Sequence, residues 1–251
     1  MSMSMIKITK EQALNYIEKL GILGVALDGF LYACPEVENI YSDEQLNGLL
    51  IFDGDFTMMH SFDQGFLSEA YDFVDENAFF NCVDYDTSKF LHESKGAFVN
   101  SYCHIYGYLS DAPTENLFPA PEGMKVTRVD LKDLDIINDF YTYKNPKSRE
   151  RLHHEIVSRD SSALYDGDKI LAWNLLHNDY AMGVMFVPPQ HRGKGYAQIV
   201  AFDLLKKVLA KGKIPYVQIV DGNTPSICLA EKLGFEPIFD ACWLSKKERK
   251  K

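Results

Sequence analysis

The fold of this chain is decided by the stretch VPPQHRGKGYA, residues 187–197, which joins an apolar strand to an amphipathic helix. Gly193 and Gly195 allow the backbone to bend and to approach a ligand closely. The first turn of the helix offers amide hydrogens that have no partner within the helix, and such donors suit a pyrophosphate. Arg192 and Lys194 add positive charge beside a helix N-terminus, which is unfavourable unless an anion binds there. The stretch therefore predicts a phosphate-binding loop.

Other glycine-rich loops fit this stretch less well. A Walker loop needs G-x-x-x-x-G-K-[ST], which is absent from the sequence. A dinucleotide-binding fingerprint needs a small residue where Gln198 stands, although Asp221 is the kind of acidic residue that such a site uses. A dinucleotide site and a plain strand-to-helix turn without a ligand therefore stay open as alternatives.

The second half of the chain alternates between strands and helices. Apolar residues follow the strand period or the helix period in successive stretches. Asp166-Gly167 suits a tight turn, which predicts a hairpin between two of the strands. The expected order is βααβββαβαβ, formed by strand 125–129, helices 131–141 and 148–159, strands 162–165, 169–176 and 181–187, helix 195–211, strand 216–220, helix 224–233 and a strand near 238–244.

The first half also has an α/β pattern. Thr9 and Gln12 have the spacing of a capping box ahead of a helix that ends near Leu20. Asp53-Gly54 suits the turn of a hairpin. The other elements expected here are the hairpin strands 49–52 and 56–60, the strands 79–83 and 97–109, and a helix near 87–93.

A linker separates the two halves. The stretch PTENLFPAPEG, residues 113–123, holds three prolines and a glycine, which leave few positions for regular hydrogen bonding. The expected domains are therefore residues 1–118 and 119–251. Both contain Asp-Gly-Asp between apolar strands, in LLIFDGDFTMM and SALYDGDKILAW. A diverged duplication is one interpretation, and coincidence is the other, because hairpin turns of this composition are common.

Charge is distributed unevenly along the chain. Residues 1–120 contain 19 Asp and Glu against 5 Lys and Arg, whereas residues 121–251 contain 17 against 21. An anionic ligand is therefore drawn to the second half, and the first half repels nucleic acid. No stretch approaches the ~20 apolar residues of a membrane span, and residues 1–10 lack the features of a signal peptide. We expect a cytoplasmic protein that binds neither nucleic acid nor a membrane.

No metal site is expected. The five cysteines are scattered, never form CxxC and are expected to be reduced thiols. The adjacent His153 and His154 would point about 100° apart on a helix, which does not suit two ligands of one metal ion.

The loop resembles the signature of the GCN5-related N-acetyltransferase superfamily, [RQ]-x-x-G-x-[GA], through Gln190, Gly193 and Gly195. Downstream, Asn223 precedes a helix that ends in EKLGF, residues 231–235, and this segment is similar to the second motif of the superfamily. The resemblance covers about 130 residues. It implies a mixed, mostly antiparallel sheet flanked by helices, preceded by an N-terminal α/β domain that would be a degenerate half of the same type.

The resemblance also implies an acyltransferase that uses acetyl-CoA or another acyl-CoA as co-substrate. The strand before the loop would bind the pantetheine arm through its backbone, with a bulge that points an amide near Val187 at the thioester oxygen. This strand would splay from the next one. The residues implied to bind coenzyme A are Met185, Phe186, Val187, Gln190, Arg192, Gly193, Lys194, Gly195, Tyr196, Ala197 and Asn223.

The reactive side chains of the superfamily have no clear counterparts here. Ala181 stands where many members carry a basic Glu, and Ala230 stands where many carry a Tyr that protonates the thiolate. Asp179 is the first candidate for the base, acting through a water, although its position in a turn offers a purely structural interpretation. Tyr180 and His177 are weaker candidates on the same grounds.

The two-domain layout resembles, more loosely, the glycine N-acyltransferase-like branch. This implies a small amine or amino acid as acceptor, bound between the halves near Trp173, where the acidic first half would favour a cation. A protein lysine or an N-terminal amine stays open as acceptor. Two other hypotheses are a non-catalytic acyl-CoA-binding or sensing protein, suggested by Ala181 and Ala230, and a nucleotide-binding regulatory module.

Overall fold

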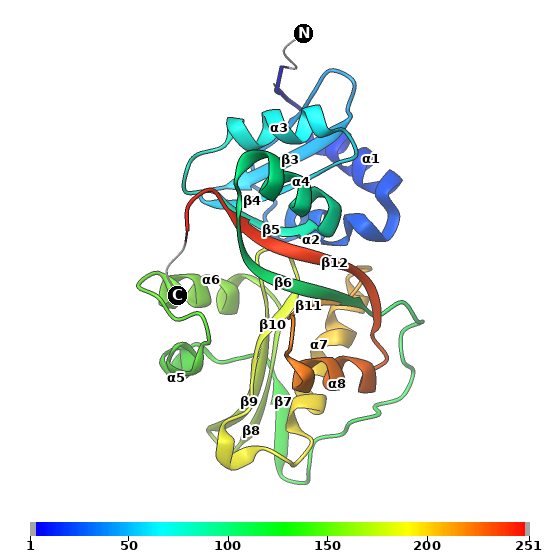
Figure 1. The fold of residues 1–251 in the computed structure, drawn as a ribbon. Coiled ribbons are helices and arrows are strands. Elements are labelled where there is room, and N and C mark those ends of the chain that lie inside the picture. Colours follow the sequence, from blue (N-terminus) through cyan, green and yellow to red (C-terminus); the bar gives the residue numbers. More distant parts are fainter. Residues whose placement is uncertain (1–3, 249–251) are drawn as a thin grey trace. The chain divides into compact units, whose positions relative to one another are not determined.

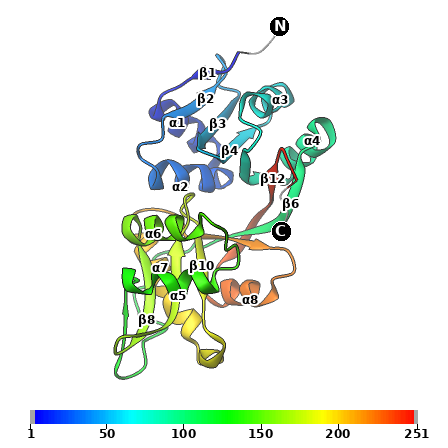
Figure 2. The same cartoon turned by 90° about the vertical axis from the view of Figure 1, so that its left-hand side faces the viewer.

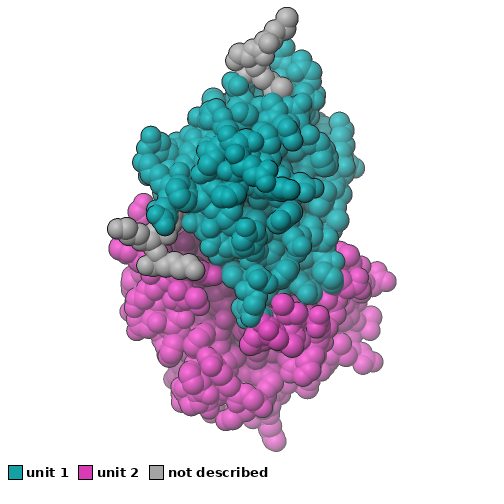
Figure 3. All heavy atoms as spheres, viewed as in Figure 1, with its two compact units in different colours: residues 1–106, 218–223, 237–251 teal, residues 107–217, 224–236 magenta. Residues whose placement is uncertain are grey.

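The computed structural model describes residues 4–248 and divides into two compact units (Figure 3). Unit 1 combines the described residues up to Tyr106 with Gln218–Asn223 and the residues from Pro237 onward. Unit 2 comprises Gly107–Val217 and Thr224–Glu236. Residues 108–123 form neither helix nor strand, as expected of the linker. The predicted domains, residues 1–118 and 119–251, are consecutive parts of the chain, whereas the two units are each made of separate segments. The boundary between residues 118 and 119 therefore stays a prediction.

Three of the helices in unit 1 begin at residues whose side chains cap the helix. α1 (Lys10–Leu20) starts after Thr9, and the reciprocal hydrogen bonds between Thr9 and Gln12 form the expected capping box. α3 (Gln64–Phe73) and α4 (Tyr85–Lys95) are capped by the carboxylates of Asp63 and Asp84. The other elements of this half of the chain are β1 (Ile6–Lys7), α2 (Val25–Ala33), β2 (Asn39–Ser42), β3 (Gly48–Asp53), β4 (Phe56–Ser61), β5 (Phe79–Asp84) and β6 (Phe98–Gly107), drawn in Figure 1.

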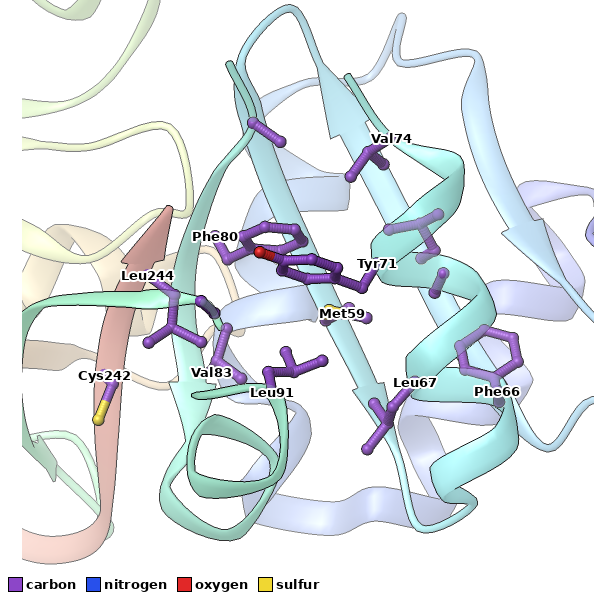
Figure 4. Close-up of a cluster of buried hydrophobic side chains, with 14 residues drawn as sticks. Met59, Phe66, Leu67, Tyr71, Val74, Phe80, Val83, Leu91, Cys242 and Leu244 are labelled. Carbon is purple, nitrogen blue, oxygen red and sulfur yellow. The ribbon is translucent and has the colours of Figure 1, made fainter. Parts of the chain in front are cut away.

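One eight-stranded sheet has the order β1-β2-β3-β4-β5-β12-β6-β11, in which β11 comprises Tyr216–Val220. β12 (Glu236–Ser245) is antiparallel to β5, with Ala241 opposite Asp84. Figure 4 shows Cys242 and Leu244 of β12 in the buried cluster that also contains the stacked rings of Tyr71 and Phe80, whose centroids lie 5.4 Å apart. The core of unit 1 is therefore completed by a strand from far along the sequence.

Unit 2 is built on a four-stranded antiparallel sheet with the order β10-β9-β8-β7. Its buried residues form one cluster with the helices α5 and α6 and a second cluster with α7, so the helices cover opposite faces of the sheet (Figure 2). The elements are β7 (Met124–Thr127), α5 (Leu134–Phe140), α6 (Ser148–Ser158), β8 (Ser161–Asp166), β9 (Lys169–Leu176), β10 (Met182–Phe186), α7 (Tyr196–Ala210) and α8 (Thr224–Lys232).

The order of elements repeats along the chain. β1 to β6 with α1 to α4 follow the order βααβββαβαβ, and β7 to β12 with α5 to α8 follow it again. The repeated order supports a duplication. However, the first Asp-Gly-Asp lies between the third and fourth strands of its half, and the second lies between the second and third strands. The two sequences are therefore not at equivalent positions, and the coincidental interpretation fits them.

The expected fold class is confirmed, because both sheets are mostly antiparallel and are flanked by helices. Every element expected in the second half is present within a few residues of its expected bounds. In the first half, four helices and strands were not expected, namely β1, α2, β2 and α3. The periodicity of α3 is visible in its buried residues Phe66, Leu67, Ala70 and Tyr71.

Candidate functional site

The expected phosphate-binding loop lies between β10 and α7 in unit 2. Gly193 and Gly195 have φ values of +76° and +77°, which L-residues other than glycine rarely adopt. A Cβ atom on Gly193 would meet nothing within 4 Å, so no side chain of the protein fills this space. The hydrogen bonds of the described residues include none donated by the backbone amides of residues 193–198. The loop therefore presents a row of unused donors at the start of a long helix.

The charge around these donors is positive. Arg192 and Lys194 are exposed, and the Arg192 Nε donates to the Val187 carbonyl at 3.0 Å. Burial, followed by the positive charges of Lys169 and Lys194, lowers the pKa of His191, so this imidazole is neutral at pH 7. An anion at the loop would thus meet the two exposed side chains together with the N-terminal end of the helix dipole.

The packing of α7 holds the loop in place. Tyr196, Ile199 and Val200 are buried against Leu164, Leu171 and Ala172 of the sheet. The first turn of the helix is thereby fixed by core residues, as a preformed binding site requires. The exposed side chain of Gln190 lies in the short 3₁₀ helix Pro189–His191 that precedes the glycines.

β10 has the expected bulge, but earlier in the strand than Val187. The register against β9 shifts between Gly183 and Phe186. Val184 has a φ of +50°, which is a strained conformation for a β-branched residue. β10 is also an edge strand of its sheet and is not paired with β11 (Tyr216–Val220), which ends the other sheet. The bulge and the free edge place Met185 and Phe186 where strand hydrogen bonds are incomplete.

The predicted catalytic residues Asp179 and Tyr180 lie in the turn between β9 and β10. Asp179 is buried, and its Oδ1 accepts a hydrogen bond from the Ala181 amide at 3.2 Å. Tyr180 is also buried and has a φ of +68°. These contacts support the structural interpretation of Asp179, and its catalytic role stays a prediction. Ala181 and Ala230 are both buried.

Two other predicted positions differ from the loop in their surroundings. Asn223 is exposed just before α8 and belongs to unit 1, whereas the loop belongs to unit 2. Its role toward coenzyme A stays a prediction. Trp173, expected near the acceptor, is buried in the core of unit 2 against Phe140 and Phe186. Its ring is therefore a packing element in this structure.

A polar cluster near β10 was only partly foreseen from the sequence. The Nδ1 atom of His177 lies 3.3 Å from Oε1 of Glu155, and Arg151 donates to the Tyr141 hydroxyl at 2.7 Å. One feature of the sequence could have indicated this cluster. Glu155 shares the buried face of α6 with Leu152 and Ile156, where an apolar residue is the norm.

The corresponding segment of the first half is built differently. Only Phe62 and Asp63 separate β4 from α3, and the Asp63 carboxylate accepts the Phe66 amide. β4 and β5 are directly paired in parallel, with Phe56 opposite Phe79. In the first half, β4 is therefore paired with the next strand, and a carboxylate occupies the N-terminus of α3. This segment does not reproduce the glycine loop of residues 187–197.

Other classes of site have little support. Among residues 4–248, no three His, Cys, Asp or Glu side chains are grouped as metal ligands would be. None of the helices in the same range combines the length and apolar character that crossing a bilayer demands.

Comparisons with known proteins agree with this architecture. The family model described as FR47-like protein matches residues 159–244. An X-ray structure of a Drosophila protein covers 97% of this chain and 98% of its own, with a TM-score of 0.73 and 15% identity. No curated protein matches the sequence.

Two further solved structures have similar folds. A GCN5-related N-acetyltransferase from Kribbella flavida covers 91% of this chain and 95% of its own, with a TM-score of 0.61 and 14% identity. A tandem GNAT protein from the clavulanic acid biosynthesis pathway covers 99% of this chain and 100% of its own, with a TM-score of 0.55 and 10% identity. At these identities the likeness is one of fold.

Proposed function

The fold of this chain is that of the GCN5-related N-acetyltransferases, and from this premise we propose that it is an acyl-CoA-dependent N-acyltransferase. The acyl donor is most simply acetyl-CoA, and the acceptor is a small primary amine or amino acid. The observation that carries the proposal is the row of unused amides at residues 193–198 beside the open space at Gly193. These donors, with Arg192 and Lys194, suit the pyrophosphate of coenzyme A.

The bulged edge of β10 supports the same proposal. Acyl transfer requires a thioester carbonyl held in a fixed orientation and hydrogen-bond donors for the oxyanion that develops. Backbone groups near Val184 and Met185 have no strand neighbour on the outer side of β10 and are available for these roles. We also propose that the protein is cytoplasmic and binds neither nucleic acid nor a membrane.

A second candidate function is non-catalytic binding of acyl-CoA. It is favoured by Ala181 and Ala230, which are buried methyl groups at the two positions where members of the superfamily often carry reactive side chains. The loop would then bind the coenzyme without a dedicated acid or base.

One experiment separates these functions. The full chain is incubated with acetyl-CoA and a panel of small amines and amino acids while released thiol is measured, and acetyl-CoA binding is measured by calorimetry. Binding with turnover is the expected result. Binding of acetyl-CoA without thiol release from any acceptor favours the binding protein. Tighter binding of NAD or ATP in the same calorimetric measurement favours a nucleotide module. Absence of any heat with acetyl-CoA contradicts both acyl-CoA hypotheses.

A further inference from the structure

The cluster of Tyr141, Arg151, Glu155 and His177 lies within unit 2 and is not used by the proposed coenzyme loop. Glu155 belongs to α6, and His177 directly follows β9. The His177 amide donates to the Ala181 carbonyl at 2.9 Å and thereby closes the turn that leads into β10. The cluster therefore connects a helix to the start of the bulged strand.

Glu155 is a buried charge with an incomplete set of partners. Its side chain is 1% exposed, Oε1 lies 3.3 Å from His177 Nδ1, and Oε2 has no hydrogen-bond partner among the described residues. The nearest guanidinium contact is Arg151 Nε at 4.0 Å. Burying a carboxylate is costly unless it is paired, so a merely structural role would favour an amide or an apolar residue here.

The carboxylate sets the direction of the His177 ring. With Nδ1 donating to Glu155, Nε2 is the basic nitrogen, and the side chain as a whole remains 32% exposed. A Cβ atom placed on Gly183 would lie 2.2 Å from Nε2, so the ring occupies the space directly over Gly183. The φ angle of Gly183 is not positive, so the backbone conformation does not demand a glycine. A glycine is needed at this position because any side chain would collide with the His177 ring. The next residue is Val184, at which the bulge begins.

The electrostatic surroundings make the His177 imidazole more basic than an unperturbed histidine. Burial lowers the pKa of His177, but the hydrogen bond and charge of Glu155, helped by Asp179, outweigh burial and Arg151, and the pKa is raised above its ordinary value. In its neutral form this imidazole is therefore a stronger proton acceptor than that of an unperturbed histidine.

We infer that His177, oriented by Glu155, is the base that removes the proton from the acceptor amine beside the bulge of β10; this inference rests on the proposed function. The amine nitrogen attacks the thioester carbonyl, the C–N bond forms, and the C–S bond breaks. The proton leaves the nitrogen for His177 Nε2, the departing thiolate takes up a proton from water, and His177 then releases its proton to the solvent. Amide and free thiol are therefore the only products. His177 is thus a catalytic residue, and Glu155 is its positioning residue.

The test compares His177→Gln and Glu155→Gln with His153→Gln and Glu150→Gln, two substitutions of exposed residues on the same helix as Glu155. His177→Gln is expected to lower kcat about 10²-fold to 10⁴-fold while acetyl-CoA affinity is unchanged. Glu155→Gln is expected to move the acidic limb of the kcat/KM profile to lower pH, because it removes the group that raises the pKa of His177. NMR titration of the His177 imidazole in wild type and Glu155→Gln measures the same shift without turnover.

The outcomes separate this inference from the proposed function. An active wild-type enzyme whose kcat and pH profile survive His177→Gln overturns the base and leaves the acyltransferase intact. A protein that binds acetyl-CoA but acylates no acceptor overturns both. If Glu155→Gln lowers the melting temperature but leaves the pH profile unchanged, the contact between His177 and Glu155 only stabilises the packing of the turn against α6. This result would also overturn the inference.

Discussion

The phenol of Tyr216 donates a buried hydrogen bond to the backbone carbonyl of Asp179 at 2.7 Å. Tyr216 is the first residue of β11, and Asp179 lies in the turn that precedes β10. Because β10 and β11 are not paired as strands, this bond is a direct link between the turn and the start of β11. The same turn contains the backbone contacts of His177, so its position matters for the proposed chemistry.

Tyr216→Phe is expected to lower the free energy of unfolding by about 1–2 kcal/mol, because a buried carbonyl loses its donor. Urea unfolding measures this loss. Tyr85→Phe is the matched control, since Tyr85 is 50% exposed. An equal effect in both variants would mean that the bond contributes nothing specific.

Gly193→Asp is expected to weaken acetyl-CoA binding at least about tenfold more than Gly193→Asn, which corresponds to about 1.4 kcal/mol. Both side chains tolerate a positive φ, so the difference isolates the charge placed against the pyrophosphate. Calorimetry provides the affinities. Gly212→Asp adds the same charge at a glycine with a φ of +68° at the other end of α7 and should leave binding unchanged. Equal affinities for the Asp and Asn variants would remove the loop from the site.

Calorimetry with acetyl-CoA is expected to give one site per chain despite the repeated order of elements. In the first half, the Asp63 carboxylate already caps α3, and β4 is paired with β5. A carboxylate at that helix N-terminus repels a phosphate group. A stoichiometry near two would contradict this account of the first half.

His104 is expected to make stability depend on pH. Hydrogen bonds to Asp240 and then to Asp221 raise its pKa, so its stabilising contribution is complete below the unfolded pKa of about 6.5 and is lost as pH rises through the folded pKa. His104→Gln should therefore cost more stability at about pH 5.5 than at about pH 8.5. Urea unfolding of both proteins at the two pH values measures the difference.

His191→Gln is the matched contrast, because the pKa of His191 is lowered in the folded state. Protonation of His191 favours the unfolded chain, so this substitution should become relatively stabilising as the pH falls. The same pH trend in both variants would contradict the assignment for His104.

Much of this structure could be predicted from short-range patterns in the sequence. The capping box at Thr9, the turns at Gly54 and Gly167 and the glycines of the loop depend on neighbouring residues alone, and each was predicted from them. The α/β order of the second half followed from periodicity in the same way. Gly193 and Gly195 were expected to let the backbone bend, and their positive φ angles agree with this expectation.

Features that depend on distant residues were not accessible from the pattern. Periodicity identified a strand near residues 238–244 but not its pairing with β5, because alternating apolar residues suit many partner strands. His177 was one of several candidates, and its partner Glu155 is 22 residues away on a helix. The strain at Val184 also depends on tertiary contacts, because a valine gives no local reason for a positive φ.

The location of β12 between β5 and β6 has a consequence for biosynthesis. The ribosome releases the residues of α1 to α4 and the first six strands long before it reaches Glu236–Ser245, yet the core around Phe80 and Leu91 is closed by Cys242 and Leu244. The nascent N-terminal half must therefore remain with an open sheet edge and an uncovered apolar surface until residues 236–245 have been synthesised. From this order of strands we expect chaperone contact during this interval and degradation of chains that stop before residue 236.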